Sequence, residues 1–544
     1  MKPGKAIFQR TRKLRIRFII PAFPTFNIYS SIAKYTTALG PVLIASVAAQ
    51  KAGWDVEVID ENNFHGHAPK DSQGHPDHDY LQNLRPADVI GFYGGLSSTI
   101  PRLYELAEFY DARGTVNIAG GQHFVGENIA ESLARHIDYL ILGEGEQTIS
   151  ELMDALSGGT AVDEIKGLAY EKDGQLVTTE KRPPISIEGI VLLPVPDFSL
   201  LRHAKLSLYP VSWERGCCMH CEFCTVKSKV RCPAPDYLVT QITSLHERFH
   251  ATNFFIVDDL FGQNRGFALE FCQKIKNYQD RLRVRFHFTV QIRLDKAGDQ
   301  ELLTAMRAAG IQVLAVGYES PIPEELKAMN KKLHPDDMIR NTKLFHRAGF
   351  LVHGMFIFGY PAMPGQDFQM SAKDRGEAFR KFIRKSGIDT IQILLPVPLP
   401  GTELTARLHE QRRIFSRQNI GWEYYDGNFQ LFEPDAPLTA LEMQEMAKKL
   451  MTHFYRWSSI VSICMSIFTF PTLIFFVSNL KKGWRGWFTR WRNSIWRFIG
   501  WRIICRWKNS RNQDTFREIL WSAQDRLNLK QGRSESFHVP KTGL

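Results

Sequence analysis

The chain has 544 residues, of which 44% are hydrophobic and 23% are charged, and its length allows roughly three to four domains. This balance excludes a mainly disordered chain, a collagen-like fibre and a polytopic membrane protein. The formal net charge is +11, but ten basic and no acidic side chains lie within residues 481–511. Subtracting those ten leaves +1, which argues against a nucleic-acid surface spread over the body of the protein.

The eight cysteines do not form the pattern of a disulfide framework. Four lie together at positions 217, 218, 221 and 224, and the other four are scattered along a long chain. The basic start of the sequence is followed by the short run IRFIIP, which is too short for the core of a signal peptide. We therefore expect a reducing compartment, the cytoplasm.

Residues 1–157 alternate short apolar runs with amphipathic stretches of ten or so residues, which predicts a doubly wound parallel sheet. The predicted strands are Ile16–Pro21, Asp55–Ile59, Val89–Tyr93, Val116–Ala119 and Tyr139–Leu142. Ligands of such sheets bind beyond the carboxyl ends of the strands. Small or polar residues follow three of these strands: Ser97, Ser98, Gly120, Gly121, Gly143 and Glu144.

Residues 158–207 are predicted to be a linker with a small hairpin, and the alternation of strands and helices resumes in residues 208–410. Six strands are predicted there, at Leu208–Trp213, Phe254–Val257, Arg285–Val290, Val313–Val316, Val352–Phe358 and Thr390–Leu394. Six such units make a partial barrel, short of the eight that close a full one. A helical extension is expected over residues 411–456. The fold class is therefore α/β, with a doubly wound domain followed by a partial (β/α)6 barrel.

The cysteine cluster directly follows the first predicted barrel strand, with the spacing Cys217-x3-Cys221-x2-Cys224. Three thiolates on one tight loop can each hold one iron of a [4Fe–4S] cubane, which leaves the fourth iron open to a small molecule. A four-thiolate zinc site would need a second cysteine pair, and none is suitably spaced downstream. Cys218 is a spare thiol in this interpretation.

This segment, CCMHCEFC, resembles the signature of the radical S-adenosylmethionine (SAM) superfamily, with Phe223 before the last cysteine. Further similar segments follow in order: FFIVDDLF, FTVQIR, VGYES, HGMFIFGYP and PVPLPGTEL. The resemblance implies that the open iron chelates SAM and that one electron cleaves SAM to methionine and a 5′-deoxyadenosyl radical. It also implies SAM-binding roles for Phe223, Arg293, Glu319 and Ser320. The alternative for the polar residues among these four is that they form salt bridges within the barrel.

A doubly wound domain before such a barrel resembles the cobalamin-binding class of the superfamily. The resemblance rests on LGPVLIASVAAQKAGWDVEVID, the Gly120–Gly121 turn and LGEGE, and it implies cobalamin contacts from Ser97, Ser98, Gly120, Gly121, Gly143 and Glu144. The loop after the first strand, PAFPTFNIYSS, lacks the histidine that replaces the nucleotide base on cobalt in classical cobalamin domains. A bound cobalamin would therefore lack a protein histidine on its lower face. The alternative is a domain that has lost the cofactor.

Residues 457–544 are predicted to be a membrane-associated tail. Residues 457–480 carry no charge and would extend about 36 Å as a helix, enough to cross a bilayer core. Residues 481–511 place tryptophans on one helical face and arginines on the other, as in helices that lie in the membrane interface. A single crossing would export ten positive charges, so we expect monotopic or peripheral attachment to the inner face of the membrane.

Together these features predict a cobalamin-dependent radical SAM enzyme that methylates an unactivated carbon of an apolar, lipid-like or isoprenoid-like substrate. The expected cofactors are a [4Fe–4S] cluster, SAM and cobalamin, and the expected partners are the membrane surface and a one-electron donor such as flavodoxin or ferredoxin. No nucleic-acid partner is expected. Two alternatives remain open: a radical cyclase, oxidase or carbon–carbon coupling enzyme without methyl transfer, and an enzyme that modifies tRNA or protein.

Overall fold

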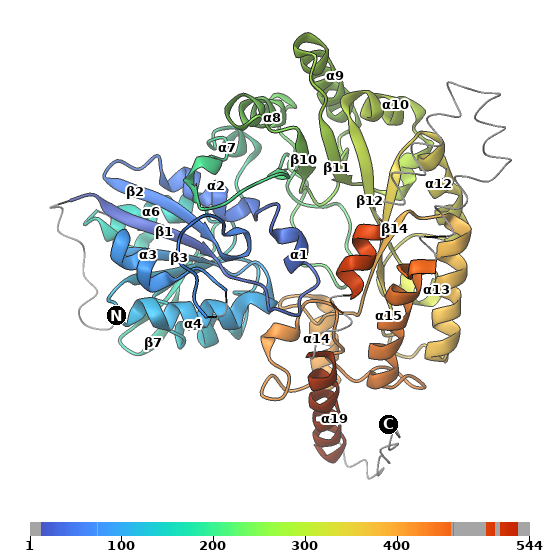
Figure 1. Ribbon diagram of the computed structural model, residues 1–544. Coiled ribbons are helices and arrows are strands. Elements are labelled where there is room, and N and C mark those ends of the chain that lie inside the picture. Colours follow the sequence, from blue (N-terminus) through green and yellow to red (C-terminus); the bar gives the residue numbers. More distant parts are fainter. Residues whose placement is uncertain are drawn as a thin grey trace.

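The computed structural model describes residues 12–72, 74–159, 161–458, 461, 497–505, 507 and 512–530. Two mainly parallel sheets, each flanked by helices, lie side by side, and the C-terminal segments pack beneath the second sheet (Figure 1). Each sheet has its own apolar core, so the molecule is built from two α/β units.

The first sheet has eight strands in the order β7-β6-β5-β4-β3-β1-β2-β8. Its strands are β1 (Leu14–Ile20), β2 (Trp54–Asp60), β3 (Val89–Tyr93), β4 (Val116–Gly120), β5 (Tyr139–Ile141), β6 (Leu168–Lys172), β7 (Gln175–Thr178) and β8 (Leu201–Arg202). The helices of this unit are α1 (Ser30–Ala33), α2 (Leu39–Ala48), α3 (His78–Leu84), α4 (Ile100–Asp111), α5 (Asn128–Leu133), α6 (Glu146–Leu156) and α7 (Ile187–Val191). The five strands predicted up to residue 157 are confirmed, and they are all parallel.

The segment 158–207 differs from the expected linker. Its predicted hairpin exists, but β6 pairs antiparallel with β5 and so extends the first sheet. At the opposite edge, β8 pairs with β2. Because backbone pairing satisfies the edge strands on both sides, this segment is part of the first α/β unit rather than a free connection.

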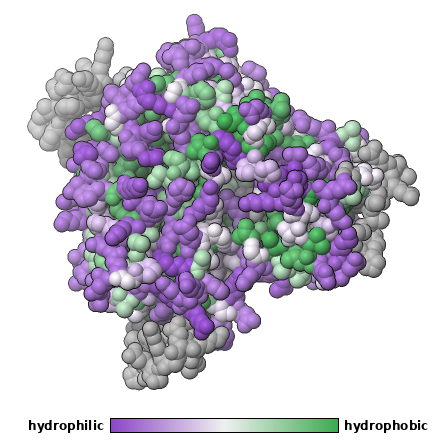
Figure 2. All heavy atoms as spheres, turned by 180° about the vertical axis from the view of Figure 1, so that it is seen from behind, coloured by the Kyte–Doolittle hydropathy of each residue, from purple (hydrophilic) through white to green (hydrophobic). Residues whose placement is uncertain are grey.

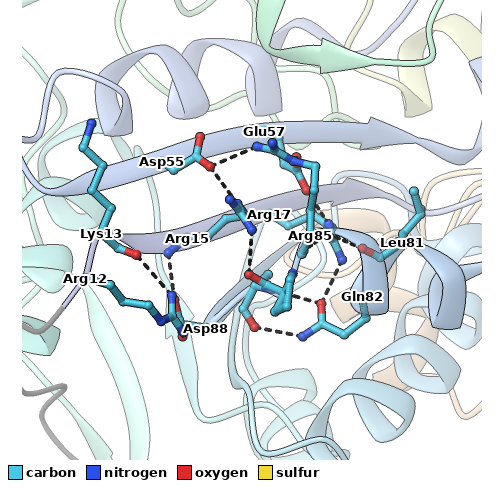
Figure 3. A network of polar contacts seen from close by, with 12 residues as sticks. Arg12, Lys13, Arg15, Arg17, Asp55, Glu57, Leu81, Gln82, Arg85 and Asp88 are labelled. Atoms are coloured by element: carbon cyan, nitrogen blue, oxygen red, sulfur yellow. Dashed lines mark hydrogen bonds and ion pairs between the residues drawn. The ribbon is translucent and has the colours of Figure 1, made fainter.

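A largely buried ionic network connects β1, β2 and the end of α3, and Figure 3 shows it from close by. Arg17 of β1 is fully buried and donates to Glu57 of β2 at 2.7 Å. Its other guanidinium nitrogens donate to Gln82 and to backbone carbonyls at the end of α3. Arg85 completes the network by donating to both Glu57 and Asp55. Since a buried charge is costly unless it is paired, this network fixes α3 against the sheet.

The second sheet has six parallel strands in simple chain order, from β9 to β14. They are β9 (Tyr209–Val211), β10 (Asn253–Ile256), β11 (His287–Gln291), β12 (Ile311–Glu319), β13 (Leu351–Ile357) and β14 (Thr390–Leu394). The outer helices are α8 (Asp236–Phe249), α9 (Arg265–Leu282), α10 (Gln300–Ala309), α11 (Pro323–Ala328), α12 (Pro335–Arg347) and α13 (Ala372–Ser386). The predicted partial barrel of six strands is thereby confirmed.

The C-terminal segments cover the open side of the second sheet and reach back to the first unit. They include α14 (Glu403–Glu410), α15 (Ala440–Phe454) and α19 (Asn512–Lys530), and α15 packs on β14. The loop after β1 meets them, since the ring of Phe26 stacks on Tyr424 at 5.3 Å and Asn27 donates to Asp426 at 3.0 Å. These contacts hold the two α/β units together.

Most of the tail predicted to associate with a membrane lies outside the described residues, namely 459–460, 462–496, 506, 508–511 and 531–544. The described later parts pack on the body, because Ile504 and Trp507 are buried in the barrel core and Phe516 and Leu520 are buried beside the first unit. None of the described helices is both long and apolar enough to cross a membrane. The surface opposite the view of Figure 1 is mostly hydrophilic with scattered apolar patches (Figure 2).

Candidate active site

The loop that follows β9 carries the cysteine motif and is held from several sides. The carboxylate of Glu222, inside the motif, accepts a bidentate pair from Arg407 of α14 at 2.6 and 2.8 Å and a hydroxyl hydrogen bond from Tyr360 at 2.6 Å. Asn330 donates to the carbonyl of His220, and Lys227 donates to that of Cys221. A loop tied to the elements that follow β12, β13 and β14 presents its thiols in one orientation.

The three motif cysteines, Cys217, Cys221 and Cys224, face one cavity of about 590 Å3 at the carboxyl ends of the barrel strands. Backbone N–H groups of Met219 and Val226 donate to the sulfurs of Cys217 and Cys224 at 3.4 Å. Burial raises the pKa of the Cys217 and Cys221 thiols, so binding of iron would have to displace their protons. Among the described residues, no group of three or more His, Cys, Asp or Glu side chains is arranged to hold a single metal ion.

Of the four residues predicted to bind SAM, Phe223, Arg293 and Glu319 line this cavity. The Arg293 guanidinium donates to Asp295 at 2.5 Å and lies 3.5 Å from the sulfur of Met219. Glu319 has a left-handed backbone with φ of 60° and forms an ion pair with Lys331 at 2.9 Å. Strain of this kind at a non-glycine residue is typical of functional sites.

The structure does not bring Ser320, the fourth residue, into the cavity. Ser320 is fully buried, and its hydroxyl donates to Glu325, which also forms an ion pair with Arg375. Ser320 lies just beyond the end of β12, and its hydroxyl also accepts a hydrogen bond from the Ile322 N–H at 3.0 Å, which holds the side chain among these buried groups. Ser320 therefore belongs to the outer wall that supports the site.

Lys331 is a site residue that the sequence analysis missed. It lines the cavity beside Glu319, and the negative groups around it outweigh its burial. Burial opposes the charged ammonium, but Glu319 and the thiols of Cys221 and Cys224 raise the pKa of Lys331. The signal in the sequence is weak, because Lys331 lies in the loop after α11 and its approach to the cysteines depends on the barrel being folded.

A second cavity, of about 350 Å3, lies at the junction of the two α/β units. Its walls come from the carboxyl ends of β3, β4 and β5, from the start of α2, and from the barrel residues Trp213, Tyr237 and Val257. Most of the lining is apolar, and glycines at the strand ends leave the space open. This is the edge at which doubly wound sheets bind ligands.

Four of the six residues predicted to contact cobalamin line this junction cavity, namely Gly120, Gly121, Gly143 and Glu144. A Cβ on Gly121 would stand 2.3 Å from the backbone of Gly94, so only glycine fits this turn. Burial alone would raise the pKa of Glu144, but hydrogen bonds from Arg231 and the N–H of Ile185 lower it. A charged Glu144 therefore ties the strand end to the linker segment.

The other two residues, Ser97 and Ser98, are buried and do not line the junction cavity. Ser97 lies 3.0 Å from Nδ1 of His123, in the loop after β4. Burial first, and then the charge of Arg417, lowers the pKa of His123 to about 3. The small residues after β3 therefore form a packed turn, which supports the loop after β4.

One short stretch of chain lines both cavities in turn. Ser212, Trp213 and Arg215 line the junction cavity, and Cys217, two residues after Arg215, lines the cluster cavity. Behind this segment, Asp258 accepts hydrogen bonds from the Ser212 hydroxyl and the Trp213 N–H, and burial raises its pKa to about 7. Ligands in the two cavities would therefore be neighbours across one short piece of chain.

Comparison with known proteins identifies the second α/β unit. Residues 211–374, from β9 to the start of α13, match the radical SAM superfamily. This part of the chain is a radical SAM domain. This match covers the cysteine loop and all the residues that line the cluster cavity, whereas the junction cavity depends largely on the preceding domain.

Relatives of this radical SAM chain include an uncharacterized methyltransferase of Pyrococcus horikoshii, 28% identical over 49% of this chain and 57% of the relative. The hopanoid C-2 methylase of Rhodopseudomonas palustris is 26% identical over 52% of this chain and 51% of its own. The chain thus spans little more than half the length of these two relatives. The solved structure of the cobalamin-dependent SAM radical enzyme OxsB has a TM-score of 0.60, 14% identity, and covers 95% of this chain and 81% of its own. That similarity shows a shared fold over both units.

The cofactors of a radical SAM domain are a [4Fe–4S] cluster and SAM. The cluster cavity fits them, because Cys217, Cys221 and Cys224 offer three thiols on one loop to one space. Beside them, the Glu319–Lys331 ion pair and Arg293 offer opposite charges. An amino acid group carries both a cation and an anion, so this pattern suits the methionine end of SAM.

Proposed function

We propose that the protein is a cobalamin-dependent radical SAM methyltransferase that acts on an unactivated carbon of an apolar substrate. The observation that carries the proposal is the closeness of the two cavities along one stretch of chain, since Trp213 and Arg215 line one and Cys217 lines the other. In this proposal the cluster with SAM would supply a radical that removes hydrogen, and cobalamin would supply the methyl group. The stretch from Ser212 to Cys217 would hold the two cofactors close to one substrate.

The junction cavity fits cobalamin in its chemistry. It is narrow and mainly apolar, and Gly120, Gly121 and Gly143 let backbone approach a flat ring closely. The first loop, PAFPTFNIYSS, offers no histidine to cobalt.

The apolar substrate and the membrane surface belong to the same proposal. The hopanoid C-2 methylase among the relatives supports a lipid-like substrate. Where the tail leaves the body, Trp457 packs on Phe498 and Trp501 with ring centroids 6.2 and 5.1 Å apart, and Trp457 remains 52% exposed. An exposed aromatic group beside the basic tail supports attachment to a membrane face in the cytoplasm.

The reductant is proposed to dock over the cluster cavity. His220, Arg293 and Lys332 lie on its rim and would attract an acidic electron carrier such as flavodoxin or ferredoxin. No nucleic acid is required by any of these features.

The test is optical and uses the full chain without oxygen. The cluster is rebuilt, cobalamin is added and reduced, and SAM is then supplied while the absorbance of methylated cobalt is followed. Stoichiometric uptake with methylation, together with S-adenosylhomocysteine formed in step with product, supports the proposal. Uptake without methylation would favour a cyclase, oxidase or coupling enzyme, and no uptake would leave a radical SAM barrel beside a domain without cofactor.

A further inference from the structure

A third cavity, of about 710 Å3, lies on the outer wall of the barrel, apart from the two cavities described above. It is bounded by α13, by the end of α15 and by the helical segment 497–505. Its polar lining comprises five basic side chains and one acidic side chain, namely Arg380, Lys381, Arg384, His453, Arg497 and Glu377. Nothing in the proposed chemistry uses these groups.

The basic side chains of α13 outnumber the available carboxylate. Residues 377, 380, 381 and 384 share one helical face because they are spaced three, four and seven apart. Glu377 approaches Arg380 at 3.9 Å, which is a weak contact between exposed groups. In the described part of the chain, Lys381 and Arg384 form no ion pair. Two cations on this face are therefore available to an anion from outside.

Arg497 enters the same cavity from the tail and is anchored without being neutralised. Its guanidinium donates to the backbone carbonyls of Ile388 and Asp389 at 3.4 and 3.2 Å and lies 4.5 Å above the ring of Phe454. Burial lowers its pKa, and the opposing effect of Asp389 does not restore it. Carbonyl oxygens and a ring fix the orientation of the guanidinium, but the positive charge remains largely uncompensated.

The remaining titratable group of the lining, His453, adds no negative charge. Burial, and then the charges of Arg456 and Arg380, lower the pKa of His453, so its ring is neutral at physiological pH. The dipole of α13 favours cations at its C-terminal end and accounts for Arg384. It does not account for Arg497 and His453, which come from other elements and meet the α13 cations at the same place.

We propose that this cavity binds a phosphate group, carried by an anionic phospholipid headgroup or by a soluble phosphate ester. A guanidinium group can bind two phosphate oxygens at once, as Arg384 of α13 could here, and Arg497 adds positive charge from the other side of the cavity. Leu450 and Phe454 line the apolar part of the cavity, where the carbon skeleton of the ligand would lie. This site goes beyond the proposed function and does not depend on it.

The test is isothermal titration calorimetry on the full chain with its cluster rebuilt. Two probes separate the sources: inorganic phosphate, and dihexanoylphosphatidylglycerol below its micelle concentration. The double variant Lys381→Gln/Arg384→Gln is expected to weaken binding about 30-fold, since each basic residue contributes about fivefold to binding an anionic headgroup. The charge-matched control Lys181→Gln/Lys205→Gln, at two exposed lysines of the linker segment, should bind like the wild type.

Binding of the lipid probe alone, lost in the double variant, assigns the site to a headgroup, and binding of phosphate assigns it to soluble esters. Either result supports the phosphate site. The proposal is overturned if neither probe binds the wild type, or if the double variant binds as tightly as the control. Thermal melting and cluster absorbance check that each variant is folded, and Arg380→Gln offers a second, single exposed change that should weaken binding about fivefold.

Discussion

The cluster cavity and the junction cavity are neighbours, but they are built from different groups. The cluster cavity presents thiols on the loop after β9 and an ion pair between Glu319, at the end of β12, and Lys331, in the loop after α11. The junction cavity presents glycines and apolar side chains, and its few charged groups are already paired with arginines. The cluster cavity is therefore defined by the chemistry of its side chains, and the junction cavity by the space that its residues leave. Substitutions in the first should remove a bound group by removing its ligands, and substitutions in the second should do so by filling the space.

The largest effect is expected when a cluster ligand is removed. Cys221→Ala leaves only two of the three motif thiols, Cys217 and Cys224, and two thiols cannot hold the cubane in place. We expect loss of the [4Fe–4S] absorbance and no detectable 5′-deoxyadenosine, while cobalamin uptake persists. Cys218→Ala is the matched control, because Cys218 is exposed and lies in the same loop. Deoxyadenosine formation by the Cys221 variant would contradict the cluster assignment.

The second prediction concerns a substitution that fills the junction cavity and leaves the cluster cavity unchanged. Gly120→Phe places a ring in the space, and overpacking of about 1–3 kcal/mol should weaken cobalamin uptake roughly 5- to 150-fold. Iron content and uncoupled cleavage of SAM should remain. Gly120→Ala is the control, since its Cβ would meet Ile141 at 3.5 Å, an ordinary contact. Equal uptake by the two variants, measured by absorbance after gel filtration, would show that cobalamin does not bind here.

The same contrast explains how much the sequence could predict. Strands β1 to β5 and β9 to β14 follow from short apolar runs, and Cys217, Cys221 and Cys224 follow from spacing, because both signals are local. The order of residues does not say which way a side chain turns after a strand, and in the structure Ser97, Ser98 and Ser320 are buried outside the two cavities. Lys331 was missed for a related reason, since its contact with the cysteine loop exists only once separate barrel units meet.

The edge strands show this limit at the level of the fold. Residues 158–207 contain the predicted hairpin, but nothing local in its sequence says that β6 joins β5 at the end of the first sheet. Pairing between strands is set by which edge is free after folding. The sequence therefore predicts where the strands lie along the chain better than it predicts which strands pair.

A third prediction concerns His123, which supports the loop beside the junction cavity. The unfolded chain takes up a proton on this imidazole near pH 6.5, whereas the folded protein does so only near its pKa of about 3. Between these values the unfolded state binds more protons, so stability falls as the pH falls. At pH 5 this loss is about 2 kcal/mol.

The measurement is denaturant unfolding at pH 7 and pH 5 for the wild type and for His123→Phe, which keeps an aromatic ring against Trp422. The wild type should lose about 2 kcal/mol more than the variant over this interval. Groups with raised pKa values, such as Asp258 and Asp426, titrate in both proteins and cancel in the difference. Identical pH dependence in the two proteins would show that His123 is not shielded from protonation.

The smallest effect is expected behind the cluster cavity, at the pair of Arg407 and Glu222. Arg407→Met removes two hydrogen bonds from a carboxylate that is only 14% exposed, but Tyr360 still donates to it. The substitution should therefore destabilise the loop by about 1 kcal/mol. Because that loop carries the cysteines, the variant should lose iron to a chelator about fivefold faster, which corresponds to about 1 kcal/mol.

Three comparisons decide whether Arg407 acts by positioning the loop. Arg407→Lys retains the charge without the bidentate contact and should restore part of the iron retention. Arg340→Met, which removes an exposed arginine paired with Asp337, should lose iron at the wild-type rate. If Arg407→Met also retains iron like the wild type, Arg407 does not position the loop. The loop would then be held by the hydrogen bonds from Asn330 to the His220 carbonyl and from the Glu222 N–H to Met329.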